Sequence, residues 1–242
     1  MNKELYPNSI NLLEHSIWEV PYLFYLREFI SENEEKNLLR FIEKAPKTKW
    51  TNLKNRTLQN WGGIPGGGKN DMMIEEPLPD WLTQWCNTFN ETLFIKTKDD
   101  SCELVPFFSK PPNHCLINKY LPGQGIMAHE DGPLYDSFVA MINLSSGIML
   151  NIYKRNESKG LDKQGCIWME PRSLWVMTEE VYSSYLHGID DIEEDIITPD
   201  INILNIDRCN ESFRKKVEHV QESKEPLSIP RDTRYSMTFR IV

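Results

Sequence analysis

Residues 234–242 of this 242-residue chain read R-Y-S-M-T-F-R-I-V, and the alternation in this stretch decides the expected fold. A period of two places one set of side chains on one face of a β-strand and the other set on the opposite face. The polar set consists of Arg234, Ser236, Thr238 and Arg240. Taken alone, the segment favours a half-exposed strand with a solvated polar face. The alternative is a strand whose two arginines bind a dicarboxylate, because guanidinium groups bind carboxylates in a bidentate manner.

Short runs of similar character fill the chain from about residue 112 onward. They are rich in β-branched, aromatic and Met residues, and Gly or Pro separates several of them. Many short strands with turn signals between them indicate a β-sandwich or barrel. We expect strands at Cys115–Tyr120, Phe138–Leu144, Ile148–Tyr153, Cys166–Glu170, Leu174–Thr178, Tyr182–His187 and Tyr235–Val242.

Two helices are expected before this β-rich part. Ser31 and Glu34 form a capping-box pattern, an apolar stripe follows at helical spacing, and Pro46 ends the run. A second helix is expected to begin near Pro79, with the apolar stripe Leu82, Trp85, Cys86, Phe89 and Leu93. We therefore expect one compact unit, with a helical N-terminal part at 1–111 and a strand-rich core at 112–242. A polar insertion at about 190–231 is expected to be helical around Asn210–Val220.

The composition excludes several classes of protein. No apolar run approaches the roughly 20 residues that a membrane span needs, and residues 1–9 lack a signal-peptide pattern. The five Cys include no C-x-x-C pair, so they are expected to be ordinary thiols in a reducing compartment. We expect a monomer in the cytoplasm and nucleus, without membrane association.

The net charge of −9 is not typical of a nucleic-acid-binding protein, but the charge is distributed unevenly. Residues 47–70 carry five Lys or Arg and no acidic residue, and they include Trp50, Trp61 and a Gly-rich stretch expected to be a flexible loop. A basic segment with interleaved aromatics suits a nucleic-acid backbone and an unstacked base. The alternative is a solvated loop whose two Trp belong to the core, and charge alone favours it.

A metal site is indicated by His129 and Asp131, which are two residues apart. On an extended chain their side chains point the same way, so both can bind one ion. The third ligand is sought among the other histidines, and His187 is best placed, at the end of an expected strand; the further candidates are His15, His114 and His219. Two His and one carboxylate form a facial triad typical of Fe(II) oxygenases, although zinc accepts the same ligands. Asn118 and Tyr120 form a second such pair, able to donate hydrogen bonds.

Several motifs together resemble the AlkB family of Fe(II)/2-oxoglutarate dioxygenases. They are N-x-Y at 118–120, P-G-Q-G-I at 122–126, H-x-D at 129–131, P-R-S-L at 171–174, His-Gly at 187–188 and R-x-S-x-T-x-R at 234–240. The segments 59–63 and 129–135 and the opening helices extend the resemblance over nearly the whole chain. It implies a double-stranded β-helix, or jelly roll, whose N-terminal extension forms a nucleotide-recognition lid.

The resemblance also implies roles for individual residues. The iron ligands would be His129, Asp131 and His187, and no other catalytic side chain is required. Contacts to 2-oxoglutarate would come from Asn118, Tyr120, Arg234, Ser236 and Arg240, with Arg234 at the distal carboxylate. The expected substrate contacts are Lys54, Arg56, Trp61 and Tyr135, and for Trp61 the alternative is packing of the lid onto the barrel.

The implied reaction uses Fe(II), 2-oxoglutarate and O₂ to demethylate an alkylated base in single-stranded or flipped-out DNA or RNA. It releases succinate, CO₂ and formaldehyde. Two alternatives stay open: an oxygenase of a protein or small molecule, and a catalytically weak nucleic-acid-binding module. The segment between His187 and Arg234 is longer than in compact members of the family, and its acidic part would repel a phosphate backbone.

Overall fold

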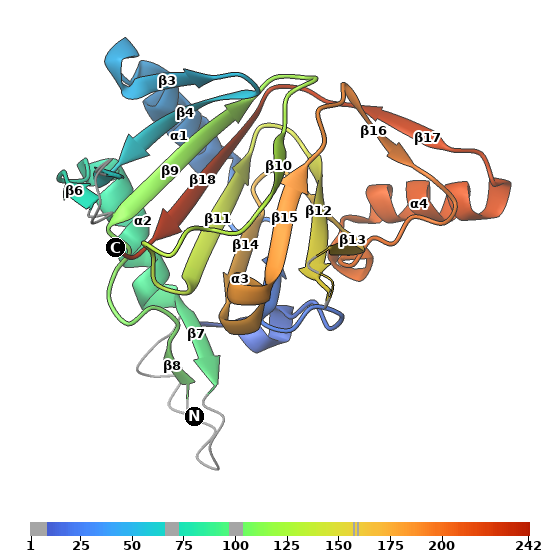
Figure 1. Ribbon diagram of the computed structural model, residues 1–242, viewed down its shortest axis with the longest axis horizontal. Coiled ribbons are helices and arrows are strands. Elements are labelled where there is room, and N and C mark those ends of the chain that lie inside the picture. The colour runs from blue at the N-terminus through green and yellow to red at the C-terminus, as the bar shows by residue number, and fades with distance from the viewer. Residues whose placement is uncertain (1–8, 66–72, 97–103, 157, 159) are drawn as a thin grey trace.

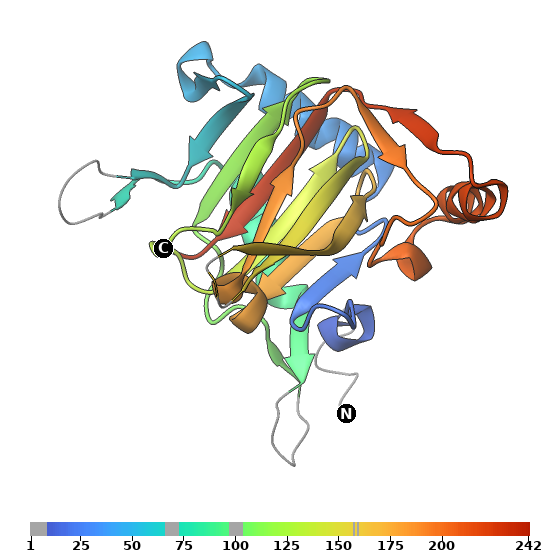
Figure 2. The same cartoon turned by 45° about the vertical axis from the view of Figure 1, so that its right-hand side comes forward.

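Two β-sheets face each other at the centre of the protein (Figures 1 and 2). The computed structural model describes residues 9–65, 73–96, 104–156, 158 and 160–242. In spatial order the major sheet consists of β2 (Leu23–Leu26), β14 (Leu174–Thr178), β11 (Phe138–Leu144), β18 (Arg234–Arg240), β9 (His114–Tyr120), β4 (Arg56–Trp61) and β3 (Trp50–Leu53). The minor sheet consists of β10 (Ile126–His129), β15 (Tyr185–Ile189), β12 (Ile148–Arg155) and β13 (Leu161–Met169). The expected sandwich of short strands is confirmed.

The outer face of the major sheet is covered by α1 (Glu32–Lys44) and α2 (Asp80–Thr92), as Figure 1 shows. The capping box at the start of α1 is confirmed, because Ser31 Oγ accepts from Glu34 N at 3.3 Å and Glu34 Oε2 accepts from Ser31 N at 2.7 Å. Phe89 of α2 packs edge-on against Phe239 of β18, with ring centroids 4.9 Å apart. The apolar set of β18 therefore faces the helices, and its polar set faces the minor sheet.

The segment between β15 and β18 forms a fourth layer on the outer face of the minor sheet (Figure 1). Phe213 stacks on Trp168 of β13, with ring centroids 4.6 Å apart and planes 2° from parallel. The Asn205 side chain accepts from Trp168 N and donates to Trp168 O, as a neighbouring strand would. The layer consists of β16 (Glu194–Ile197), η3 (Ile206–Arg208), α4 (Glu211–Ser223) and β17 (Leu227–Pro230), so the expected helix is confirmed.

Two expectations about local structure are wrong. The strand expected at Tyr182–His187 begins only at Tyr185, because residues Glu179–Ser184 form helix α3, in which Val181 is buried. The basic segment is not a loop, because β3 and β4 form a hairpin and β4 pairs with β9. Residues 66–68 of the Gly-rich stretch lie outside the described residues.

The expected boundary at residue 111 does not separate helices from strands. Three strands of the N-terminal part, β2, β3 and β4, complete the major sheet, and β2 pairs with β14 along its whole length. The remaining short elements are β1 (Ile10–Asn11), η1 (Leu12–His15), η2 (Lys47–Lys49), β5 (Gly63–Pro65), β6 (Met73–Glu75), β7 (Leu93–Lys96) and β8 (Leu104–Pro106). Within the described residues, no helix has the length and hydropathy that a membrane crossing requires.

The outer layer is fastened by a buried ion pair whose two side chains are each 3% exposed. Arg231 donates from Nη2 to Asp195 Oδ1 at 2.7 Å and from Nε to Oδ2 at 3.0 Å. Its Nη1 donates to the carbonyl oxygen of Asp190 at 2.6 Å. This side chain therefore joins both ends of the segment to the end of β15.

We predict that Asp195→Ala lowers the free energy of unfolding by about 3–5 kcal/mol, because it leaves a buried guanidinium without a counterion. Urea unfolding followed by circular dichroism measures the change. The double variant Arg231→Met/Asp195→Leu, which removes both charges, is expected to recover most of the loss. A loss below about 1 kcal/mol in the single variant, the median range for exposed pairs, would contradict this assignment.

Candidate metal and dicarboxylate site

A cavity of about 190 Å³ lies between the two sheets. Drug-sized ligands occupy sites of about 300–1,000 Å³, so this cavity suits a smaller molecule. The major sheet contributes Asn118, Tyr120, Arg234, Ser236, Thr238 and Arg240 to its lining, and the minor-sheet side contributes Ile126, His129, Asp131, His187 and Ile189. The sandwich thus brings the expected metal ligands and the polar face of β18 into one cavity.

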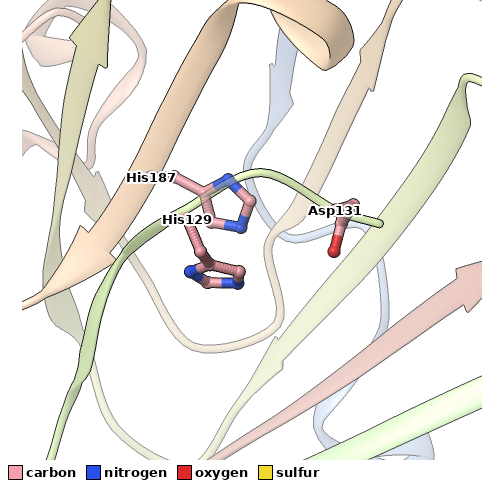
Figure 3. Close-up of side chains that lie close together, drawn as sticks. All are labelled: His129, Asp131 and His187. Atoms are coloured by element: carbon pink, nitrogen blue, oxygen red, sulfur yellow. The ribbon is translucent and has the colours of Figure 1, made fainter. Parts of the chain in front are cut away.

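His129, Asp131 and His187 form a cluster on the minor-sheet side, which Figure 3 shows. His129 ends β10 and lies directly across from His187 of β15, with ring centroids 4.5 Å apart. Asp131 follows in the loop after β10. One potential ligand atom from each of the three residues lies within 4.8 Å of the others. Two imidazoles and a carboxylate arranged in this way could hold Fe(II) or Zn²⁺.

The surroundings keep all three groups in the protonation state that a metal requires. His129 Nδ1 donates to Met127 O at 2.9 Å in the tautomer that leaves Nε2 free for a metal. Burial lowers the pKa of both histidines, that of His187 to about 3. Burial alone would raise the pKa of Asp131, but the charge of the Arg240 guanidinium and its hydrogen bond lower it below its usual value. At neutral pH the cluster therefore offers two neutral imidazoles and a carboxylate.

Arg240 contacts the metal cluster directly. Its Nη2 forms an ion pair with Asp131 Oδ1, and both side chains are buried. The Tyr135 ring covers this guanidinium, and the ring centroid lies 4.6 Å from Cζ of Arg240. The structure thus places Arg240 against an expected metal ligand, where it orients Asp131. Arg240 also lines the cavity, so its expected contact to the cosubstrate stays a prediction.

Arg234 is the most deeply buried charged side chain that lines the cavity, because it is only 1% exposed. Its Nε donates to Asn143 Oδ1 at 2.5 Å, and its guanidinium lies over the Tyr120 ring at 5.4 Å. Burial lowers the pKa of Arg234 to about 10, and no described carboxylate pairs with it. A buried cation without a counterion is costly, so this position fits a carboxylate ligand. Every residue of β18 is buried, which excludes the solvated-face interpretation.

Of the four expected substrate contacts, only Arg56 lines the cavity. Lys54 is exposed in the turn between β3 and β4. Trp61 lies on the helix side of the sheet, where its Nε1 donates to Gln59 Oε1 at 2.9 Å and its ring meets Trp81 edge-on at 6.1 Å. For Trp61 the packing alternative therefore describes the structure. Tyr135 packs between Arg240 and His114.

The sequence interpretation missed two residues that shape the site. Asn143 accepts from Arg234 and uses its amide nitrogen to donate to the carbonyl oxygens of Met169 and Glu170. Its only signal in the sequence is that it is the one polar residue within an apolar strand. Trp175 packs edge-on against His187 at 5.0 Å, and nothing in its sequence context distinguishes it from a core residue.

The chain is similar to known proteins along most of its length. The family described as "2OG-Fe(II) oxygenase superfamily" matches residues 67–240. The chain is 34% identical over 230 residues to "Probable RNA/DNA demethylase ALKBH6" of Danio rerio, which covers 92% of this chain and 86% of that protein. It is 27% identical over 233 residues to "tRNA (carboxymethyluridine(34)-5-O)-methyltransferase ALKBH8" of Macaca fascicularis, covering 85% of this chain and 33% of that protein.

Among solved structures, "The structure of OsALKBH1" matches with a TM-score of 0.55 and 15% sequence identity. The match covers 91% of this chain and 98% of that chain. At this level of identity the likeness concerns the fold, and it agrees with the expected jelly roll.

His114 provides a pH test of the packing beside the cavity. This side chain is fully buried, and neither ring nitrogen has a hydrogen-bond partner among the described residues. Burial, followed by the charge of Arg240, lowers the pKa of His114 to about 4. The imidazole is therefore neutral in the native state, whereas in the unfolded chain it takes up a proton below about pH 6.5.

We predict that this proton uptake lowers the free energy of unfolding by about 2 kcal/mol between pH 7 and pH 5. The variant His114→Leu should lack this part of the pH dependence, as measured by urea unfolding of metal-free protein at each pH. Equal pH slopes in the variant and the wild type would show that His114 is protonated in the native state or exposed.

Proposed function

Since the chain belongs to the 2OG-Fe(II) oxygenase superfamily, we propose that it is a dioxygenase that removes a methyl group from an alkylated base of DNA or RNA. The family defines the enzyme class and the requirement for Fe(II), 2-oxoglutarate and O₂. The nucleic-acid substrate is supported by the relative from Danio rerio, whose name describes a probable RNA/DNA demethylase. The substrate would be single-stranded or have its base flipped out, because the cavity is enclosed by two sheets.

One observation carries this proposal: a two-histidine, one-aspartate cluster shares a small cavity with a buried arginine that has no carboxylate partner among the residues that the structure describes. His129, Asp131 and His187 would hold the iron. When bound, iron together with 2-oxoglutarate and O₂ supplies the oxidation of the methyl C–H bond, with release of succinate, CO₂ and formaldehyde. The donor set fits Fe(II), since two imidazoles and one carboxylate leave positions open for further ligands.

The other side chains of the cavity bind, orient and exclude water. Arg234 binds the distal carboxylate of 2-oxoglutarate, and Ser236 on the same face is within the cavity lining. Asn118 and Tyr120 present an amide and a hydroxyl from the adjacent strand β9. Arg240 holds Asp131 ionised and in place. Ile126, Ile189 and Trp175 provide the apolar wall that keeps bulk water away.

One observation favours a second candidate, an oxygenase of a protein or small molecule. Asp190 and Asp191 are exposed at the end of β15, and Asp191 Oδ2 accepts from Asn55 at the tip of the β3–β4 hairpin at 2.5 Å. Carboxylates beside the hairpin tip repel a phosphate backbone that passes on this side. Salt dependence separates the two candidates.

The iron and cosubstrate assignments are tested by spectroscopy. We predict that anaerobic protein mixed with Fe(II) and 2-oxoglutarate shows a visible charge-transfer band, and that His187→Ala lacks it because the variant loses one of three metal ligands. Metal content of both proteins serves as the control. Wild-type protein that binds iron but shows no band would refute the cosubstrate assignment.

The substrate class is tested by binding to a methylated single-stranded oligonucleotide, measured by fluorescence polarisation at several salt concentrations. We predict that affinity falls as salt rises, and that Lys54→Glu weakens binding and flattens this dependence, because a cation near phosphate releases counterions. Glu211→Lys on the outer helix α4 is the charge-change control. Affinity that is independent of both salt and Lys54 would favour the protein or small-molecule substrate.

A further inference from the structure

Arg56 extends from the β3–β4 hairpin into the cavity, to the side where strand β9 presents its polar residues. Its Nε donates to Asn118 Oδ1 at 3.1 Å. The hairpin that carries it is held at its base by pairing of β4 with β9 and at its tip by the Asn55–Asp191 hydrogen bond. Arg56 is therefore fixed at the inner side of the hairpin, whereas Lys54 points to solvent from the turn.

The chemistry of this contact determines how the Asn118 amide is turned. A guanidinium has only donors, so the amide atom that faces Arg56 must be the oxygen. The amide NH₂ then faces away from Arg56. Asn118 is 6% exposed and lines the cavity, and no described group accepts from its NH₂. Two N–H donors of Asn118 are thus available to an anionic ligand in the cavity.

The charges of the cavity point to the same ligand. Three guanidinium groups line it, and that of Arg240 is paired with Asp131. Neither Arg56 nor Arg234 forms an ion pair with a described carboxylate. Burial raises the pKa of Tyr120 while Arg234 and Arg56 both oppose that shift, so both cations act on one hydroxyl. Two cations without counterions match the two carboxylates of a dicarboxylate.

We propose that Arg56 is a positioning residue for 2-oxoglutarate. It holds the side chain of Asn118 so that the amide NH₂ of Asn118 is turned toward the cosubstrate. This inference rests on the proposed function. It assigns Arg56 a role in binding the cosubstrate, whereas the sequence predicted a contact to the substrate. Strand β4, in the N-terminal part that was expected to form the lid, would then also complete the cosubstrate site.

The first measurement is the dissociation constant of 2-oxoglutarate, determined by isothermal titration calorimetry on Mn(II)-loaded protein, which needs no turnover. We expect Arg56→Ala to raise it about tenfold or more, because hydrogen bonds to charged groups contribute about 1.5–3 kcal/mol and each 1.4 kcal/mol is a factor of ten. The matched control Lys54→Ala, two residues away on the same hairpin, should leave it unchanged. Arg56→Lys keeps a charge and a donor and should fall between the two.

A double-mutant cycle tests whether Arg56 acts through Asn118. In the background of Asn118→Ala, we expect Arg56→Ala to raise the dissociation constant by less than about threefold, so the two effects are not additive. Asn118→Asp keeps an oxygen for Arg56 but replaces the NH₂ with a second carboxylate oxygen, and it should weaken 2-oxoglutarate at least as much as Asn118→Ala. Additive effects in the cycle would overturn the positioning role.

Binding of the methylated oligonucleotide to the same variants separates this proposal from the proposed function. If Arg56→Ala keeps wild-type affinity for 2-oxoglutarate but binds the oligonucleotide about tenfold more weakly, Arg56 is a substrate contact and the inference is wrong. If wild-type protein does not bind 2-oxoglutarate, the proposed function itself fails. Circular dichroism of each variant checks the fold, and Arg56→Lys supports the same comparison if Arg56→Ala does not fold.

Discussion

The burial of two guanidinium groups on one strand is the constraint on which the rest of this structure depends. Strand β18 places Arg234 and Arg240 between the sheets and Phe239 against the helices. A shift of one residue in its register would exchange these faces, so the helical layer and the cavity together fix the strand. Asp131 neutralises the charge of Arg240. Arg234 contacts an amide oxygen and an aromatic ring, and it faces the cavity, which has space for an anion.

Features that depend on local sequence could be predicted, and those that depend on distant partners could not. The capping box of α1 and the alternation in β18 are local patterns, and the structure contains both. Strand β4 lies in a polar, basic stretch that looks like a loop when it is considered alone. Its partner strand β9 lies more than fifty residues further along the chain, so no local pattern indicates the pairing. The pairing of Arg240 with Asp131 depends on how the loop after β10 folds, which no spacing rule describes. Trp61 is of a residue type that can stack on a base, but the pairing of its strand in the sheet turns the side chain toward the helices.

The acidic segment between β15 and β18 has a structural use for many of its charges. Asp195 neutralises Arg231 in the interior, and the Asp190 side chain accepts from Asn151 of β12 at 2.9 Å. The same segment pairs with the edge of β13, where the Cys166 backbone donates to Asn202 O at 2.9 Å and accepts from Leu204 N at 2.8 Å. It therefore shields both the outer face and one edge of the minor sheet.

That shielding leaves β10 as the exposed edge of the minor sheet, since no described strand pairs with its other side. The strand has four residues, its register with β15 is irregular, and Met127 within it is 88% exposed. A metal held by His129 and His187 would bridge β10 to β15 and stiffen this edge. Iron starvation would then threaten solubility as well as activity, because a loosened strand edge with an exposed methionine is a template for aggregation between molecules.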